Sequence, residues 1–280
     1  CPPFKVTHEL GASEGGHTDS INAILITDGP TSEGQSGEER CSAVTAASDG
    51  MLIVWDVGAG KALRRCSHGA AVTAMARVDE EFILSCGVDG QVREWRWRTG
   101  SQMRELFLSP SGVPLSSMSF HVPTNTLALG NRAGELCVWR VNPRNDNPDV
   151  NINCYPLTEW SFAGRDPPAH AAGPANEVAA IQHDGDKIVF ALRSGIARVV
   201  WLGDMPDEGM PFGIYTSGRS VRRTSPFERP TAAVNLGIAW QVRLYVSTLV
   251  YCGNLLVSDG FDNQVLVLHV GVDDELEHTR

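Results

Sequence analysis

Histidine and aspartate residues recur in matching places near the start of this chain. His17 and Asp49 lie in one stretch, and His68 and Asp89 lie in the next. Imidazole and carboxylate groups are common agents of general acid–base catalysis. A catalytic pair normally occurs once in a chain, however, whereas these residues recur together with a longer repeated pattern. We therefore predict a structural role for all four.

The repeated pattern is a turn followed by a β-rich run that ends in a large apolar residue. Its clearest copy reads S-D-G-M-L-I-V-W-D-V over residues 48–57, with an Asp-Gly turn signal and a final Trp-Asp. Each copy reads as strands separated by turns, without helical periodicity. The five copies are anchored 40, 44, 62 and 67 residues apart at Trp55, Trp95, Trp139, Trp201 and Leu268. A period of about 40–45 residues with four strands per unit predicts an all-β β-propeller.

The pattern divides the chain into five blades of a single propeller domain. The blades are predicted at about 12–66, 67–108, 113–163, 176–217 and 232–270. Polar or proline-rich stretches predict enlarged loops at 28–40, 142–176 and 203–232. The sequence after Val270 is a poor strand. We therefore expect a strand over residues 4–10 to complete the last blade and to remove an exposed sheet edge.

Short motifs inside the repeats are shared with a known family. They are a Trp-Asp pair, Gly-His or His-Gly pairs before the first strands, and turn aspartates: Trp55-Asp56, Gly16-His17, His68-Gly69, Asp49 and Asp89. In these motifs the chain resembles the WD-repeat family. The resemblance implies a buried hydrogen-bond relay that joins a loop histidine, a turn aspartate, a strand hydroxyl and the tryptophan. The relay residues would be His17, Asp49, Thr45 and Trp55 in the first unit, and His68, Asp89, Ser85 and Trp95 in the second.

The other units depart from the relay pattern. The last unit keeps Ser258 and Asp262 but ends in Leu268, and the third has Ala133 at the aspartate position. We expect these blades, and the fourth, to be held by packing alone. Seven blades are the commonest number in the family, and the chain begins with Cys1 rather than Met. Two readings stay open, a five-bladed ring and an excerpt of a seven-bladed ring, and we favour the second.

Composition excludes several classes of partner. The formal net charge of −10 argues against a nucleic-acid partner, because phosphate contacts need a basic face. The seven cysteines form no C-x-x-C pair and have no histidine at zinc-ligand spacing, so no disulfide framework or zinc site is predicted. This cysteine usage favours the cytoplasm or nucleus. We find no signal peptide, and the most apolar window, residues 236–257, contains charged and polar residues, so no membrane partner is predicted.

The predicted channel offers little for catalysis. The innermost strands carry small and apolar residues, and His121 and His183 lie at strand ends, where we expect rim or packing roles. No pair of acids shares a site, and no phosphate-binding glycine loop, nucleophile elbow or metal-ligand cluster occurs. The sequence therefore predicts no enzyme, cofactor, metal or small-molecule substrate.

The predicted turns gather at one end of the blades and surround one mouth of the channel. Side chains beside them are candidates for binding a protein or peptide, and arginine and aromatic residues are the types that contribute most to such interfaces. The candidates are Asp19, Ser48, Arg132, Arg193 and Phe261.

One loop is basic in an otherwise acidic chain. Residues 217–230 contain four arginines and one glutamate, and Arg-Arg-Thr-Ser-Pro within them resembles a kinase substrate. Phosphorylation of Thr224 or Ser225 would cancel the local charge. The hypothesis is a regulated docking loop, and the alternative is an ordinary solvated loop.

Together these patterns predict a non-enzymatic scaffold that presents a protein- or peptide-binding face within a multiprotein complex. One alternative resembles the substrate-recognition subunits of ubiquitin ligases, which grip phosphorylated peptides with arginines. Arg132 and Arg193 fit that alternative, although no F-box segment occurs in these residues. Further alternatives are a propeller enzyme with a site in the channel and a purely structural part of a larger complex.

Overall fold

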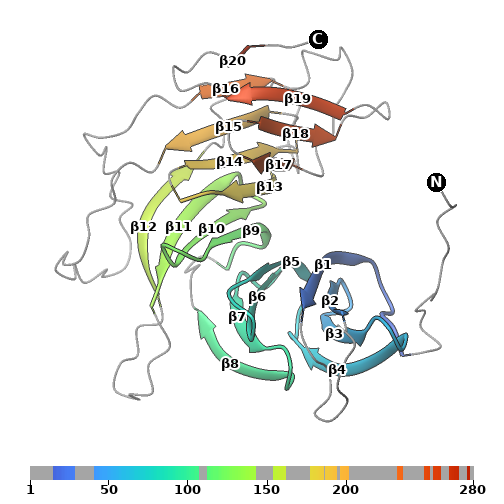
Figure 1. The fold of residues 1–280 in the computed structure, drawn as a ribbon. Coiled ribbons are helices and arrows are strands. Elements are labelled where there is room, and N and C mark those ends of the chain that lie inside the picture. The colour runs from blue at the N-terminus through green and yellow to red at the C-terminus, as the bar shows by residue number, and fades with distance from the viewer. Residues whose placement is uncertain are drawn as a thin grey trace, which may run out of the picture.

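The computed structural model describes residues 15–28, 41–106, 112–142, 154–161, 177–185, 187–193, 196–201, 232–235, 249–252, 255–259, 265–270 and 276–277. Within these residues every regular element is a β-strand. The strands form five antiparallel sheets of four strands each, which follow one another along an arc (Figure 1). The prediction of an all-β, propeller-like fold is confirmed.

Each sheet, or blade, consists of four strands that are consecutive in the chain. The first blade contains β1 (Ile21–Asp28), β2 (Cys41–Ala47), β3 (Met51–Asp56) and β4 (Lys61–Ser67). The second contains β5 (Val72–Arg77), β6 (Phe82–Gly87), β7 (Val92–Arg96) and β8 (Ser101–Leu106). The third contains β9 (Leu115–His121), β10 (Thr126–Asn131), β11 (Glu135–Val141) and β12 (Cys154–Ser161).

The fourth blade contains β13 (Val178–His183), β14 (Lys187–Leu192), β15 (Ile196–Trp201) and β16 (Ala232–Asn235). The fifth contains β17 (Leu249–Cys252), β18 (Leu255–Asp259), β19 (Val265–Val270) and β20 (Leu276–Glu277). The first strands of successive blades, from β1 to β17, pack against one another. Among the described residues we find no extensive packing between strands of the fifth blade and strands of the first.

Glycines set the turns between the second and third strands. Gly50, Gly90 and Gly134 occupy the same place in the first three blades, with φ of +77°, +73° and +83°. Side chains other than glycine rarely adopt this left-handed region. A Cβ atom on Gly90 would also lie 2.9 Å from the carbonyl oxygen of Val113. The glycine of the turn signal is therefore required by the backbone conformation of the turn.

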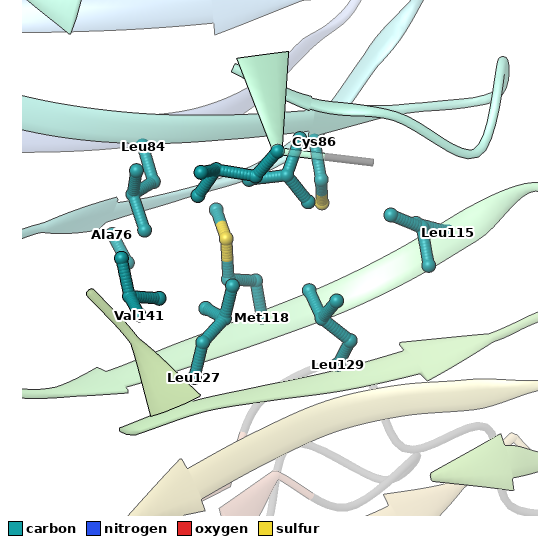
Figure 2. Packing of buried hydrophobic residues seen from close by; sticks show 10 residues of the cluster. Ala76, Leu84, Cys86, Leu115, Met118, Leu127, Leu129 and Val141 are labelled. Carbon is teal, nitrogen blue, oxygen red and sulfur yellow. The ribbon is translucent and has the colours of Figure 1, made fainter. Parts of the chain in front are cut away.

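Apolar side chains fill the seams between neighbouring blades. In the seam between the second and third blades, Leu84 and Cys86 of β6 face Met118 of β9 and Leu127 of β10 (Figure 2). Strand β6 is buried at every position, as expected for a strand covered on both faces. Burial raises the pKa of the Cys86 thiol to about 11, so this cysteine acts as a small hydrophobe. The blades are held to one another by this packing, because stabilisation grows in proportion to the apolar surface area removed from water.

The outer strand of the fourth blade differs from the prediction. The predicted blade ended at residue 217. In the structure β16, at residues 232–235, pairs with β15, although those residues were assigned to the start of the fifth blade. β16 has only four residues, A-A-V-N, without polar–apolar alternation, so its sequence gave no strand signal.

The outer strand of the fifth blade differs as well. We expected residues 4–10 to take that place because residues 271–280 read as a poor strand. Instead β20 pairs with β19, with Val270 opposite Leu276 and His269 opposite Glu277. A local hairpin needs a much shorter loop to close than a pairing with the chain start. Residues 4–10 lie outside the described residues, as do 29–40, 143–153, 162–176 and 203–231 of the predicted loops.

A candidate binding face at the turn end of the blades

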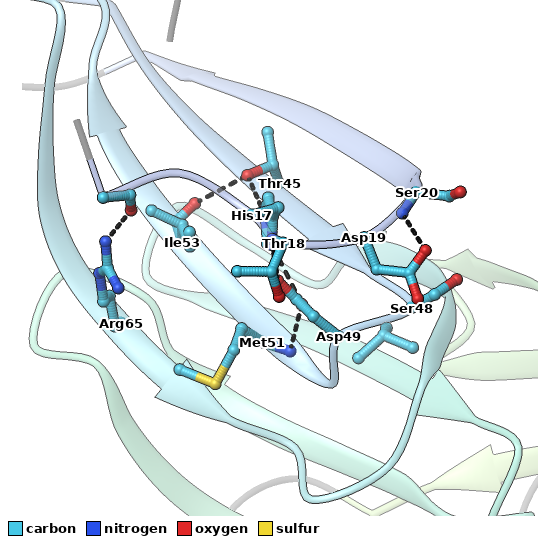
Figure 3. A network of polar contacts seen from close by, with 12 residues as sticks. His17, Thr18, Asp19, Ser20, Thr45, Ser48, Asp49, Met51, Ile53 and Arg65 are labelled. Carbon is cyan, nitrogen blue, oxygen red and sulfur yellow. Dashed lines mark hydrogen bonds and ion pairs between the residues drawn. The ribbon is translucent and has the colours of Figure 1, made fainter. Parts of the chain in front are cut away.

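The first blade brings its four predicted relay residues together, and Figure 3 shows three of them, His17, Asp49 and Thr45. Nδ1 of His17 lies 3.0 and 3.1 Å from the two carboxylate oxygens of Asp49, and Nε2 lies 2.8 Å from Oγ1 of Thr45. A carboxylate can only accept, so Nδ1 carries the proton and donates. The indole N–H of Trp55 donates to the same Oγ1 at 2.8 Å. The chain of bonds therefore runs from the turn to the centre of the sheet.

The Asp49 carboxylate is held ionised by its hydrogen bonds. It accepts from the backbone N–H of Thr18 and of Met51, both at 2.9 Å, besides His17. Burial opposes the ionised form, but these donors outweigh it and hold the pKa of Asp49 below its usual value. Asp49 therefore fixes the loop before β1 against the β2–β3 turn.

The second blade forms a variant of this arrangement. Nδ1 of His68 lies 2.9 Å from Oγ of Ser85, and the indole N–H of Trp95 donates to the same oxygen at 2.8 Å. Nε2 of His68 lies 3.5 Å from Asp89, a longer approach than in the first blade. The hydroxyl is therefore contacted by Nδ1 of the histidine in this blade, whereas Nε2 makes that contact in the first blade.

Arg93 accounts for the difference, and the sequence prediction missed it. Its guanidinium donates to the Asp89 carboxylate at 2.8 Å and lies 3.4 Å from the carboxylate of Glu105. Burial and the Arg93 charge lower the pKa of His68 to about 4, with the Asp89 charge opposing them. His68 is therefore neutral near pH 7. A signal existed in the four-residue spacing from Asp89 to Arg93.

The third blade replaces the turn aspartate with another polar residue. Ala133 stands at the aspartate position, as predicted, but Oδ1 of Asn131 accepts from the backbone N–H of Ala133 at 3.0 Å and of Glu135 at 2.9 Å. The Asn131 amide donates to the Glu135 carboxylate at 2.7 Å. Asn131 matches Gly87 of the second blade, where a Cβ would lie 2.8 Å from His68. This blade thus has a polar brace of its own, which the prediction of packing alone overlooked.

The residues just before the turns are anchored alike in four blades. Each donates its backbone N–H to a carbonyl in the segment before the first strand of its own blade, at 2.8–3.1 Å. The donor and acceptor pairs are Ser48 and Ser20, Val88 and Ala71, Arg132 and Pro114, and Arg193 and Glu177. The candidate side chains at these positions therefore project from equivalent, fixed points around one end of the arc.

Two of the candidate arginines share a buried carboxylate. Glu177 is 8% exposed; its carboxylate lies 2.9 Å from Nε of Arg193 and 3.9 Å from Nε of Arg132. The side chains of Arg132 and Arg193 are 52% and 36% exposed. Only their Nε atoms are engaged in these contacts. The pair thus sits across the seam between the third and fourth blades, and both side chains stay partly exposed.

The first blade contributes polar groups to the same end. Asp19 is exposed, and its carboxylate accepts from the backbone N–H of Ser20 at 2.6 Å. The Asn22 amide donates to Oγ of Ser48 at 2.9 Å and to the carbonyl of Val72 in the second blade at 2.6 Å. Asn22 was not among the predicted residues, although it lies three residues after Asp19, which was. Asp19 and Ser48 therefore belong to a braced surface.

Several predicted residues lie outside the described part of the chain. These are Phe261, Asp262, Thr224 and Ser225. Ser258 lies in β18 and pairs with Leu249 of β17.

The histidines at the opposite end of the blades pack against each other across a seam. The rings of His121 and His183 are 5.2 Å apart in an edge-on arrangement. Nδ1 of His121 bonds to the Thr124 hydroxyl at 2.8 Å. Within the described residues no group of three or more histidine, cysteine, aspartate or glutamate residues could hold a metal ion, and no described helix is long and apolar enough to cross a membrane.

No protein-family model matches the chain. Among curated proteins, the target of rapamycin complex subunit wat1 from Schizosaccharomyces pombe is 30% identical over 130 residues, which cover 45% of this chain and 37% of that protein. The ribosome biogenesis protein ytm1 from Aspergillus niger is 24% identical over 155 residues, which cover 50% of this chain and 31% of that protein. The chain therefore spans about a third of each relative. Both are WD-repeat-type proteins, so the comparison suggests that family.

The fold has a counterpart among solved structures. The crystal structure of the computationally designed Ika8 protein superposes with a TM-score of 0.54 at 19% sequence identity. The match covers 94% of this chain and 62% of that chain. At this identity the likeness shows the fold alone.

Proposed function

We propose that this chain is a non-enzymatic WD-repeat scaffold whose turn end binds a protein or peptide within a multiprotein complex. The observation that carries the proposal is that some polar side chains at that end are used up in contacts within the blades, whereas others are exposed. The relay histidines and aspartates make contacts within their own blades. Arg132 and Arg193, by contrast, project from anchored backbone positions and are partly exposed, and Asp19 at the same end is exposed. Rigid presentation of polar groups lowers the entropy lost on binding.

The names of the curated relatives support the same class. One is a subunit of the target of rapamycin complex, and the other is a ribosome biogenesis protein. Neither name describes a catalyst. We therefore expect a protein partner, in the cytoplasm or nucleus, and no cofactor, nucleic acid, membrane or small-molecule substrate.

The phosphopeptide alternative has one observation in its favour and one against it. Two arginines stand on neighbouring blades at the binding end, as a phosphate-reading site requires. Glu177, however, lies against both, so the group of three carries a net charge of +1 rather than +2. That charge suits a single carboxylate of an acidic side chain better than a dianionic phosphate. We rank an acidic peptide segment above a phosphorylated one.

Quantitative affinity purification tests the proposal. The tagged chain is compared with the double variant R132A/R193A. R64A is the matched control, because Arg64 is exposed on β4 and donates to the neighbouring Leu63 carbonyl. The double variant should lose at least about tenfold of its main partner, since each charged contact contributes about 1.5–3 kcal/mol. Unchanged capture by a folded double variant would refute a role for this end.

Measuring binding of synthetic peptides then separates the two ligand classes. A peptide from the captured partner is compared in its acidic, phosphorylated and alanine-substituted forms by calorimetry. Tighter binding of the acidic form supports our ranking, and tighter binding of the phosphorylated form favours the alternative.

A further inference from the structure

The first blade places a carboxylate at the turn end. Asp19 is exposed in the loop before β1. Its carboxylate accepts from the backbone N–H of Ser20 at 2.6 Å, and a carboxylate has lone pairs for several further donors. The backbone N–H of Ser48 donates to the Ser20 carbonyl at 2.9 Å, so the β2–β3 turn lies next to this loop (Figure 3). The first blade therefore offers a negative charge that can accept from a ligand.

The second blade and the loop that follows it present small apolar side chains at the same end. These residues are half-buried and lie before β5, after β6 and before β9: Ala70, Ala71, Val88, Val113 and Pro114. The charged residues of the β6–β7 turn, Asp89 and Arg93, are joined by a hydrogen bond of 2.8 Å. This part of the turn end is therefore suited to apolar contact with a ligand.

Close contacts join these parts to the arginine pair. A Cβ atom on Gly50 would lie 3.1 Å from the carbonyl oxygen of Ala70, so the first blade touches the second at this end. Gly90 lies as close to Val113 and joins the second blade to the third. The contacts of Glu177 with both arginines join the third blade to the fourth. We call the whole row the turn strip: Asp19, Ser48, the five apolar residues, Arg132 and Arg193.

The length of the turn strip sets the spacing that a ligand must span. Asp19 belongs to the first blade and Arg132 to the third, so two sheet spacings separate them. Packed sheets lie about 10 Å apart, which gives a path of about 20 Å, and the curvature of the arc shortens it. An extended peptide rises about 3.3 Å per residue, so about four to six residues separate the two charged ends.

The charge of the whole chain favours a ligand that carries both signs. The formal net charge of −10 repels a segment whose only charges are acidic. A basic residue in the same segment offsets this repulsion and meets the exposed carboxylate of Asp19. The acidic residue of the segment then lies at the other end of the turn strip, where Arg132 and Arg193 carry the positive charges.

We propose that the ligand of the turn strip is an extended peptide segment of a partner protein, with a basic and an acidic residue about four to six positions apart and apolar residues between them. The basic residue pairs with Asp19, and the acidic residue pairs with Arg132 and Arg193. The apolar residues cover the second blade. Complementary charges at both ends fix the register of the segment. This inference rests on the proposed function, because it specifies the ligand of the same end.

Selection from a display library of random nine-residue peptides tests this inference. The peptides that wild type enriches are compared with those that D19K enriches. E80K is the matched control, because it changes the charge by the same amount and Glu80 is exposed in the loop between β5 and β6, at the other end of β6. Circular dichroism and thermal unfolding establish that both variants are folded before the selection.

The expected result is an exchange of charge at one position of the selected peptides. Wild type and E80K should enrich peptides with a basic and an acidic residue at the stated spacing. D19K should enrich peptides with an acidic residue in place of the basic one, while the apolar positions and the other acidic residue are retained. In calorimetry, a synthetic peptide from the wild-type selection should bind D19K at least about tenfold more weakly, and its variant with glutamate at the basic position should regain affinity for D19K.

The selection separates failure of this inference from failure of the proposed function. Acidic peptides without a spaced basic residue, or identical peptides from wild type and D19K, would overturn the two-charge ligand. If R132A/R193A then failed to enrich those peptides, binding of acidic peptides at the arginine pair would stand. Both proposals would be wrong if no peptide were enriched by wild type, or if R132A/R193A selected the same peptides as wild type.

Discussion

Replacing Ser85 with alanine tests whether the buried relay of the second blade stabilises the fold. Ser85 is fully buried, and its hydroxyl is shared by the ring of His68 at 2.9 Å and the indole N–H of Trp95 at 2.8 Å. The S85A variant removes one oxygen and leaves two buried nitrogens without that partner. No large cavity is created, so the main effect is electrostatic.

The expected cost follows from the two groups left unsatisfied. Each buried polar group without a hydrogen bond costs about 1–3 kcal/mol. Allowing for partial relaxation, S85A should lower the free energy of unfolding by about 2–4 kcal/mol. Since a domain of this kind is stable by only about 5–15 kcal/mol, the loss is large enough to measure easily.

Urea unfolding followed by far-ultraviolet circular dichroism provides the assay. S101A is the matched control, because Ser101 is exposed at the start of β8, and it should change stability by less than about 0.5 kcal/mol. A double-mutant cycle with W95F isolates the indole bond: S85A should cost about 1 kcal/mol less in the W95F background. A cost below about 0.5 kcal/mol for S85A alone would refute the view that the relay braces the blade.

Three further predictions concern groups buried in or near the seams. The R104A variant should lose about 3–5 kcal/mol of stability in urea unfolding, because it removes the positive charge that lies 2.8 Å from the carboxylate of Glu94, whose side chain is 1% exposed; similar stability of R104A and wild type would contradict this. Burial, and then the neighbouring His121 charge, lower the pKa of His183 from 6.5 to about 4. The unfolded chain therefore takes up a proton near pH 6.5 that the folded chain refuses, so stability should be complete above that pH and fall between pH 6.5 and 4. The H183Q variant should flatten that part of the curve, and an unchanged slope would count against the assignment. The G130A variant should cost about 1–3 kcal/mol in the same assay, since its Cβ would lie 2.5 Å from Cβ of Val178 in the next blade; wild-type stability would show that the seam can open to admit a methyl group.

The repeat was readable from the sequence because its determinants are local. An Asp-Gly turn needs glycine for its left-handed φ, as Gly50 and Gly90 show, and the first three tryptophan anchors recur after 40 and 44 residues. Relay residues could be assigned through the family resemblance, and the structure places all four of the first blade within hydrogen-bonding distance. Local chemistry and repetition therefore revealed both the fold class and much of the brace.

What the sequence did not reveal depends on contacts between segments that are distant or interchangeable. Arg93 competes for Asp89 only because both side chains lie on one side of a tight turn. Glu177 meets Arg132 only after two blades have packed together. The outer strands β16 and β20 are short edge strands, for which several segments have adequate composition. Edge strands gain little from burial, so their sequences are weakly constrained.

Among the described residues, each sheet is made of strands that follow one another directly, and none of these strands is exchanged between sheets. A chain with this layout can complete one sheet as soon as its last strand leaves the ribosome, before the next sheet has been synthesised. Every finished sheet then offers a ready apolar wall for its successor to assemble on. Synthesis itself would therefore order the assembly, from β1 toward β20.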